Sequence, residues 1–398
     1  MHHKIVLWWG LLVCPLWAGA ETVYVGDFSA ALGQSFFQRK LSSFNGNASG
    51  NLALATRLNE ARSIMASYSG QYGNFVNTEQ LVGGGYLFQQ SMTHQVNISG
   101  VMPIKTKINL EPRLGIKRGF FNETKDEPWS KGLFDYRRIN LGTDLFFGDQ
   151  ESNEYMSLGY DFFQNTYPNF KDNLGARFGQ ELAQEEFNPG SKLLDSVDHQ
   201  LSLGSAFSEP SEDKTGRYDL FLIQRLYEDQ KIINQDGTYA AKKRRDLTFT
   251  LSKTRFFTDR RKKESEISLT YLDSNQNHLD ANLDRLKFIP DYYDYAELTW
   301  KPLWGFRKQP PYLQLSNEVI LRGYLGRDAQ KSGGEYSENK TVTLSDNLEL
   351  RLGAPIGGGW AWQIAMNIGF GLSNNFYKAP YTYNYFLLNY FGGLAWRF

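Results

Sequence analysis

Large apolar residues recur at every second position along much of this 398-residue chain. The longest run is Trp360, Trp362, Ile364, Met366, Ile368, Phe370 and Leu372, with small or polar residues at the positions between them. A period of two predicts a β-strand with one apolar face and one more polar face. Similar runs lie at 108–116, 139–147, 156–162, 218–226, 313–325 and 342–352. Each covers roughly 10 residues, the length that a tilted strand needs to cross a membrane.

The end of the chain carries the most specific signal. The last predicted strand runs to Phe398, with Tyr390, Leu394 and Trp396 on the same face. This pattern resembles the C-terminal recognition signal of Gram-negative outer-membrane β-barrel proteins, a porin-like class within which no subfamily is identified. The resemblance implies residence in the bacterial outer membrane and contact with its lipids and lipopolysaccharide. It also implies that the barrel-assembly machinery recognises these four residues.

The start of the chain predicts export. A basic residue, Lys4, precedes an apolar run at 5–17 and the small residues Ala18-Gly19-Ala20. This arrangement is typical of a cleaved secretory signal peptide, expected to cover residues 1–20. Residues 21–398 are then expected to form one barrel domain. The single cysteine lies in the signal segment, so the exported chain has no disulfides.

Connection lengths predict the number of strands. Long connections are expected at 119–133, 165–196, 228–243, 274–291, 326–337 and 373–383, and shorter ones at 148–153, 208–215, 258–263, 304–310 and 353–358. Bacterial barrels have short periplasmic turns, long outside loops and an even number of strands. With a first strand near 22–32, the fold class is all-β, a transmembrane antiparallel up-and-down barrel of about sixteen strands. Fourteen or eighteen strands stay open, because the run at 52–72 keeps one register throughout.

Composition agrees with a barrel and excludes other classes. Mean hydropathy is −0.48, and after residue 20 no apolar stretch approaches the 18 or so residues of a membrane-spanning helix. Aromatic residues make up 15% of the chain, which suits outward residues that meet lipid. The net charge is zero, so no nucleic-acid partner is expected. The basic runs 242–245 and 260–263 are interpreted as solvated strand ends. No metal or other cofactor is expected, and a homo-oligomer is left open.

Alternation also predicts which charges line the lumen. The candidates are Arg113, Arg138, Asp144, Asp161, Arg217, Asp219, Arg225, Glu318, Arg322, Glu349 and Arg351. They either line a wet channel and filter solutes by size and charge, or pair with each other and fill a closed lumen. Sixteen strands enclose more room than side chains fill, which favours the channel. The 165–196 loop is expected to fold into the mouth, where Glu181, Glu185 and Glu186 set selectivity.

These features predict a channel for passive or facilitated passage of small polar solutes. Two alternatives are a partner-gated export port, for example for polysaccharide, which inward aromatic residues suit, and a structural or surface-interaction barrel. An outer-membrane enzyme is not expected. The nearest approach to a catalytic triad is Asp198, His199 and Ser202, and alternation places His199 and Ser202 on opposite faces of the wall.

Overall fold

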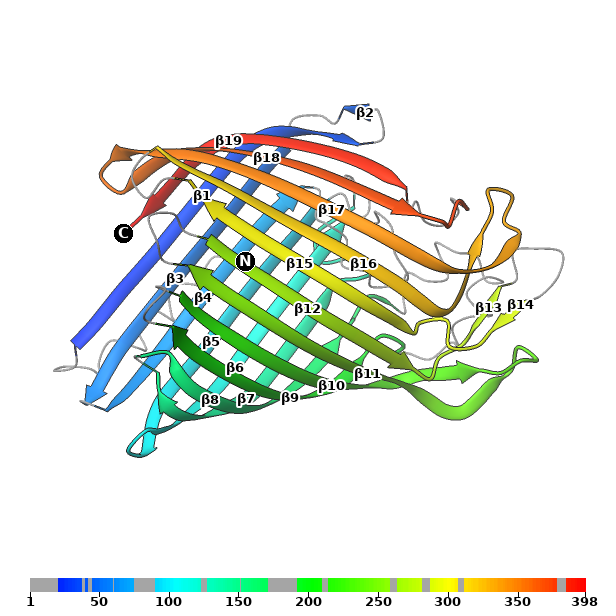
Figure 1. Cartoon of the computed structure of the whole chain (residues 1–398), viewed down its shortest axis with the longest axis horizontal. Helices are drawn as coiled ribbons and strands as arrows, with labels where there is room; N and C mark the ends of the chain where they lie inside the picture. The colour runs from blue at the N-terminus through cyan, green and yellow to red at the C-terminus, as the bar shows by residue number, and fades with distance from the viewer. Residues whose placement is uncertain are drawn as a thin grey trace.

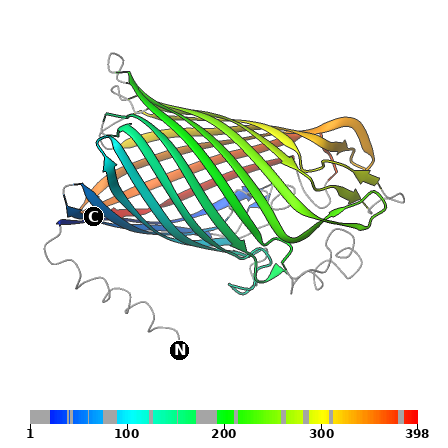
Figure 2. The same ribbon diagram turned by 90° about the horizontal axis from the view of Figure 1, so that it is seen from below.

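Antiparallel strands close into one barrel in the computed structural model (Figure 1). The structure describes residues 21–37, 40–41, 45–59, 61–74, 90–122, 127–150, 152–170, 192–209, 214–257, 263–280, 287–306, 311–377 and 384–398. Within these residues there are sixteen barrel strands, which confirms the predicted fold class and strand number. Figure 2 shows their common tilt to the barrel axis.

The barrel strands are β1 (Glu21–Phe37), β3 (Asn45–Asn59), β4 (Arg62–Asn74), β5 (Gln90–Lys105), β6 (Ile108–Asn122), β7 (Tyr136–Asp149), β8 (Glu154–Thr166), β9 (Ser196–Glu209), β10 (Lys214–Ile233), β11 (Tyr239–Phe257), β12 (Lys263–Ser274), β15 (Tyr295–Gly305), β16 (Tyr312–Gln330), β17 (Tyr336–Gly357), β18 (Trp360–Ser373) and β19 (Tyr385–Arg397). Three short strands, β2 (Lys40–Leu41), β13 (His278–Asp280) and β14 (Lys287–Ile289), lie outside this ring. Each barrel strand pairs with the next along the chain, so the topology is up-and-down.

The first and last strands close the barrel. β1 pairs with β19 on one side and β3 on the other, which confirms the predicted first strand near 22–32. Phe398 extends this seam, because its backbone N–H donates to the Gly26 oxygen at 3.0 Å and its oxygen accepts from the Gly26 N–H at 3.1 Å. Its ring packs on Trp396 with centroids 4.7 Å apart, and both rings lie near Phe28.

A hidden turn divides the long run at 52–72. β3 and β4 form a hairpin in which the Asn59 side-chain oxygen accepts hydrogen bonds from the backbone N–H groups of Ala61 and Arg62, at 3.0 and 2.8 Å. An asparagine that bonds to the backbone just ahead of it is a common turn former. Even-numbered residues pair with even-numbered residues across this hairpin, as Leu54 does with Ala66. The period of two therefore continues through the turn, which is why the sequence does not reveal it.

The two ends of the barrel differ. Short turns such as 105–108, 149–154 and 357–360 lie at the end that holds Phe398, which is therefore the periplasmic end. At the other end, the hairpins β10–β11 and β16–β17 extend furthest (right in Figure 1). The β13–β14 hairpin bonds to both of them.

These bonds are specific to each extension. Gln276, just before β13, accepts a hydrogen bond from the Ile233 N–H at 3.1 Å and donates to the Lys231 oxygen at 3.0 Å. On the other side, Lys287 of β14 forms an ion pair with Asp328 at 2.9 Å. The outer end thus has a wall built from two long hairpins and one short hairpin between them.

The outer surface of the barrel is apolar. The exposed large hydrophobic residues lie mainly on the outward face of the barrel strands, as at Leu114, Leu141, Leu158, Leu203 and Leu298. Such a surface is expected where the wall meets lipid, and a closed barrel leaves no backbone polar group unpaired there. None of the described residues forms a helix long and apolar enough to span a membrane.

Candidate functional site: the lumen wall

The inner face of the barrel is charged on one side and neutral on the other. On β18, β19, β1, β3, β4 and β5 it carries mainly Ser, Thr, Asn, Gln, Gly and Ala. Away from the strand ends, Asp27 is the one charged residue there within the described chain. The structure places all the predicted pore-lining charges on the contiguous strands β6–β17. Sequence reasoning identified these charges but missed the opposing neutral wall.

Arg113 on β6 holds two carboxylates. Its guanidinium donates to both oxygens of Asp144, one of these bonds being 3.1 Å long, and to Asp161 at 2.9 Å. Two inward glycines make room for these acids. A Cβ at Gly142 would meet an oxygen of Asp161 at 1.8 Å, and one at Gly159 would meet an oxygen of Asp144 at 2.1 Å. The acids therefore lie along the wall rather than across the lumen.

A second network runs across β7–β10 nearer the outer end. Arg225 donates to both oxygens of Asp198, at 3.0 and 2.9 Å, and Asp198 is almost fully buried. The Asn165 amide donates to the same carboxylate at 3.1 Å, and its oxygen accepts from Arg138 at 2.7 Å. Arg138 therefore donates to an amide oxygen, whereas Arg225 donates to a carboxylate. Its guanidinium also lies 5.5 Å from the Phe163 ring.

Arg244 on β11 is an inward residue that sequence reasoning missed. Its guanidinium donates to both oxygens of Asp246, at 2.9 and 2.8 Å. It lies between two aromatic rings, 4.6 Å from the centroid of Tyr227 and 4.4 Å from that of Tyr293. The interpretation of 242–245 as solvated strand ends is thus wrong for this residue, although its neighbours Lys243 and Arg245 are exposed. The signal was its alternation with Asp246 and Thr248. Most of the other basic run, 260–263, lies outside the described residues.

The remaining predicted charges also occur in pairs. The pairs are Arg217–Asp219 at 2.7 Å, Arg322–Glu297 at 2.7 Å, Lys301–Glu318 at 2.8 Å and Arg351–Glu349 at 2.5 Å. They differ in exposure: the side chain of Arg351 is 56% exposed and that of Arg322 is 14% exposed. The wall therefore combines buried ion pairs with ion pairs that face open space.

The acids predicted to narrow the mouth, Glu181, Glu185 and Glu186, lie outside the described residues. The described ends of their loop are anchored. Phe170 and Leu193 are buried with Leu133 and Phe134 of the β6–β7 loop in one hydrophobic cluster. The loop thus starts and ends on a fixed part of the outer rim.

The outer rim contains one turn three times. Asp135, Asp195 and Asp294 each directly precede a strand that runs from the outer rim towards the periplasmic end. Each also follows two large apolar or aromatic residues. Each side chain accepts a hydrogen bond from a backbone N–H at the end of the preceding strand. The donors are Phe121 at 2.8 Å, Tyr167 at 2.7 Å and Ser274 at 2.7 Å, respectively. These carboxylates therefore join the outer ends of neighbouring strands.

Burial sets the protonation of these rim acids. Desolvation raises the pKa of Asp135 from 3.8 to about 6, and bonds from the Phe121 and Gly132 N–H groups offset part of that rise. Burial also raises the pKa of Asp294 to about 6, and it raises the pKa of Asp195. Sequence reasoning missed this group, although the recurring pattern of two apolar residues followed by Asp at the start of a strand could have revealed it.

The C-terminal residues predicted as an assembly signal lie on the outward face of β19. Tyr390, Leu394 and Phe398 are exposed, and Trp396 stacks on Trp360 of β18 with centroids 5.9 Å apart. Recognition of these residues by assembly machinery stays a prediction.

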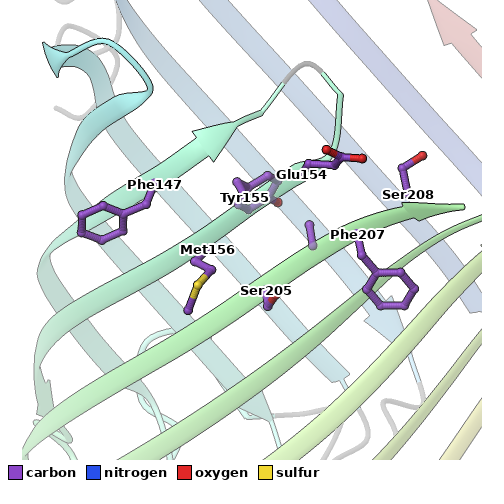
Figure 3. A pocket seen from close by; sticks show the side chains of 8 residues that line it. Phe147, Glu154, Tyr155, Met156, Ser205, Phe207 and Ser208 are labelled. Atoms are coloured by element: carbon purple, nitrogen blue, oxygen red, sulfur yellow. The ribbon is translucent and has the colours of Figure 1, made fainter.

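A shallow groove lies near the periplasmic ends of β7, β8 and β9 (Figure 3). Phe147 and Met156, both exposed, line it on the lipid-facing side. Tyr155, one of the inward aromatic residues, packs on Phe146 with centroids 5.4 Å apart. Nothing at this groove brings ionisable side chains together. Within the described chain, no group of three or more His, Cys, Asp or Glu residues could hold a metal ion.

Solved structures of outer-membrane barrels resemble the chain at low sequence identity. No protein-family model and no curated protein matches the chain. Solved structures that resemble it include OmpT, an outer-membrane protein of Vibrio cholerae (9% identity, 96% of this chain and 99% of that chain, TM-score 0.46), and OccAB1 of Acinetobacter baumannii (9%, 94% and 96%, 0.47). CdiB of Acinetobacter baumannii also resembles it (9%, 93% and 60%, 0.45). At this level the likeness is to the barrel fold alone.

The chain is a β-barrel of the bacterial outer membrane. The closed sheet and the exposed apolar belt are the physical basis for this assignment.

The prediction that the chain is not an enzyme is corrected. The barrels it resembles include OmpT, and the shared fold leaves an enzymatic function open. The geometry argues against one arrangement only. His199 hydrogen-bonds to the Tyr160 hydroxyl at 2.8 Å, on the same face as exposed Leu201 and away from Ser202. The three residues proposed as the nearest approach to a triad therefore do not converge.

Proposed function

We propose that this barrel is a water-filled channel for small polar solutes. The observation that supports it is the partial exposure of paired inward charges. The side chains of Arg113, Arg217, Arg225 and Arg351 are 31, 42, 39 and 56% exposed although each contacts a carboxylate. Charges that filled a closed lumen would be buried among their partners. Sixteen strands also enclose more space than their own side chains fill.

The division of the wall suggests what the channel passes. Along β6–β17 nearly every cation has a carboxylate beside it, so the fields of the two signs largely cancel at a distance. The facing strands offer hydroxyl and amide groups, which hydrogen-bond solutes of either charge or none. Such a lumen suits small polar solutes with weak charge preference.

The exposed pair Glu349–Arg351 allows a test in which removal of either charge should shift the ion selectivity in opposite directions. The protein spanning 21–398 is refolded and inserted into planar bilayers, and conductance and reversal potential are measured in a salt gradient. Glu349→Gln leaves Arg351 unpaired and should shift selectivity towards anions, whereas Arg351→Gln should shift it towards cations. Arg255→Gln is the control, because Arg255 is exposed on the outward face near the periplasmic end of β11.

Stable conductance steps with these two opposite shifts support the proposal. A folded barrel that gives no conductance overturns it and favours a partner-gated port. Equal shifts in all three variants would show that Glu349 and Arg351 do not face the conducting path.

A further inference from the structure

Two arginines lie side by side on the lipid-facing wall. Arg118 on β6 and Arg137 on β7 are direct cross-strand partners, and both are exposed. They face outward, because Ile116 and Ile139 form the next pair on the same face, and Leu114 and Leu141 the one after it. Within the described residues no acidic group contacts either guanidinium. Like charges directly opposite each other destabilise a sheet. Among the described residues, this pair therefore has no compensating anion.

Their level in the wall is fixed by two aromatic groups that flank them. On β4 and β5 the Tyr68 hydroxyl hydrogen-bonds to His94 Nδ1 at 2.8 Å, and His94 is the other cross-strand neighbour of Arg118. On β8 and β9 the Tyr160 hydroxyl makes the same bond to His199, also at 2.8 Å.

A phenylalanine ring packs against the histidine of each of these Tyr–His pairs. Phe120 lies edge-on to His94 with centroids 6.3 Å apart, and Phe162 lies edge-on to His199 at 5.6 Å. Rings with polar edges gather where a barrel wall leaves the hydrocarbon and meets headgroups. Because Arg118 and Arg137 lie near the outer ends of their strands, that level is the headgroup layer of the outer leaflet.

The chemistry of the site selects an anionic headgroup with several acceptor oxygens. Guanidinium groups bind phosphate through two parallel hydrogen bonds, and cross-strand partners have Cα atoms only about 5 Å apart. Two neighbouring guanidinium groups can therefore bind one phosphate group. Below them, the exposed side chains of Leu114, Ile116 and Leu141 offer an apolar surface for acyl chains.

We propose that Arg118 and Arg137 bind the phosphate of an outer-leaflet glycolipid, the lipid A part of lipopolysaccharide. Position and charge identify the ligand: the site is at the outer end of the lipid-facing surface, and the described residues there present two cations without an acid. The guanidiniums face away from the lumen, so this inference does not depend on the proposed channel function.

Binding of defined lipids to the barrel in detergent micelles tests the proposal. Native mass spectrometry or an equilibrium binding assay compares lipid A, fully dephosphorylated lipid A and phosphatidylglycerol. The Arg118→Gln/Arg137→Gln variant should lose roughly tenfold to hundredfold in affinity for lipid A. The charge-matched control is Arg62→Gln/Arg255→Gln, which removes two exposed arginines at the periplasmic end and should bind as the parent does.

Dephosphorylated lipid A should bind the parent as weakly as lipid A binds the double variant. The proposal is overturned if the double variant binds lipid A within twofold of the parent, or if removal of the phosphates changes nothing. Equal binding of phosphatidylglycerol would overturn the assignment to a glycolipid. The conductance of the double variant should be unchanged, which separates this test from that of the channel.

Discussion

Arg113 is the best position at which to test how the inner wall is held together. It contacts Asp144 and Asp161, whose side chains are only 14 and 8% exposed. Replacing it by glutamine leaves two neighbouring carboxylates without their cation. A hydrogen bond to a charged group contributes about 1.5–3 kcal/mol, and loss of one partner of a buried ion pair costs about 3–5 kcal/mol. Arg113 is itself 31% exposed, so water replaces part of the interaction and we expect a loss of about 2 kcal/mol.

The matched control removes all three charges. Arg113→Gln/Asp144→Asn/Asp161→Asn has no uncompensated charge, so it should recover most of the stability lost in Arg113→Gln. The assay is equilibrium unfolding by urea of the barrel in lipid vesicles, followed by tryptophan fluorescence. In bilayers, the single variant should also become more cation-selective and the triple variant should not. A single variant that loses less than about 0.5 kcal/mol, or a triple variant that is less stable than the single one, would refute the reasoning.

Two further predictions concern the rim and the seam. The rim carboxyls Asp135 and Asp294 have a pKa of about 6 when folded against an ordinary value of 3.8, so the folded state binds protons more tightly. Their contribution to stability therefore rises as the pH falls from about 6 to about 4. The free energy of unfolding, measured by urea titration in lipid vesicles, should therefore be larger at pH 5 than at pH 7, and the Asp135→Asn and Asp294→Asn variants should reduce this dependence. At the seam, Gly26→Ala should slow closure of the barrel, because a Cβ there would lie 2.3 Å from the Phe398 ring. Folding measured by heat-modifiable gel mobility should be slower than in Gly323→Ala, since a Cβ at Gly323 meets nothing within 4 Å; equal rates would contradict the role of this contact.

The sequence determined the repeating features of this protein. Alternation depends only on the two faces of a strand, so it predicts which residues meet lipid and which face inward wherever the strand is regular. This is why most of the strands and the inward direction of residues such as Arg113 and Arg225 followed from the pattern, whereas the strand number also required the alternation of long and short connections. The short turns followed from it as well, whereas the long connections expected at 228–243 and 326–337 are mostly strand, with only 234–238 and 331–335 between the paired strands.

Only the tertiary structure decided which residues meet across strands. Pairing Asp198 with Arg225, or placing Arg244 between Tyr227 and Tyr293, requires the register of neighbouring strands and the path of a loop. The turn at Asn59 also became visible only in the structure, because the alternation of apolar and polar residues continues through it without a break. The rim carboxylates did so too, because their hydrogen-bond partners lie 14 to 28 residues away along the chain. Contacts of this kind depend on distances in space between residues far apart in sequence, and a pattern of period two carries no information about them.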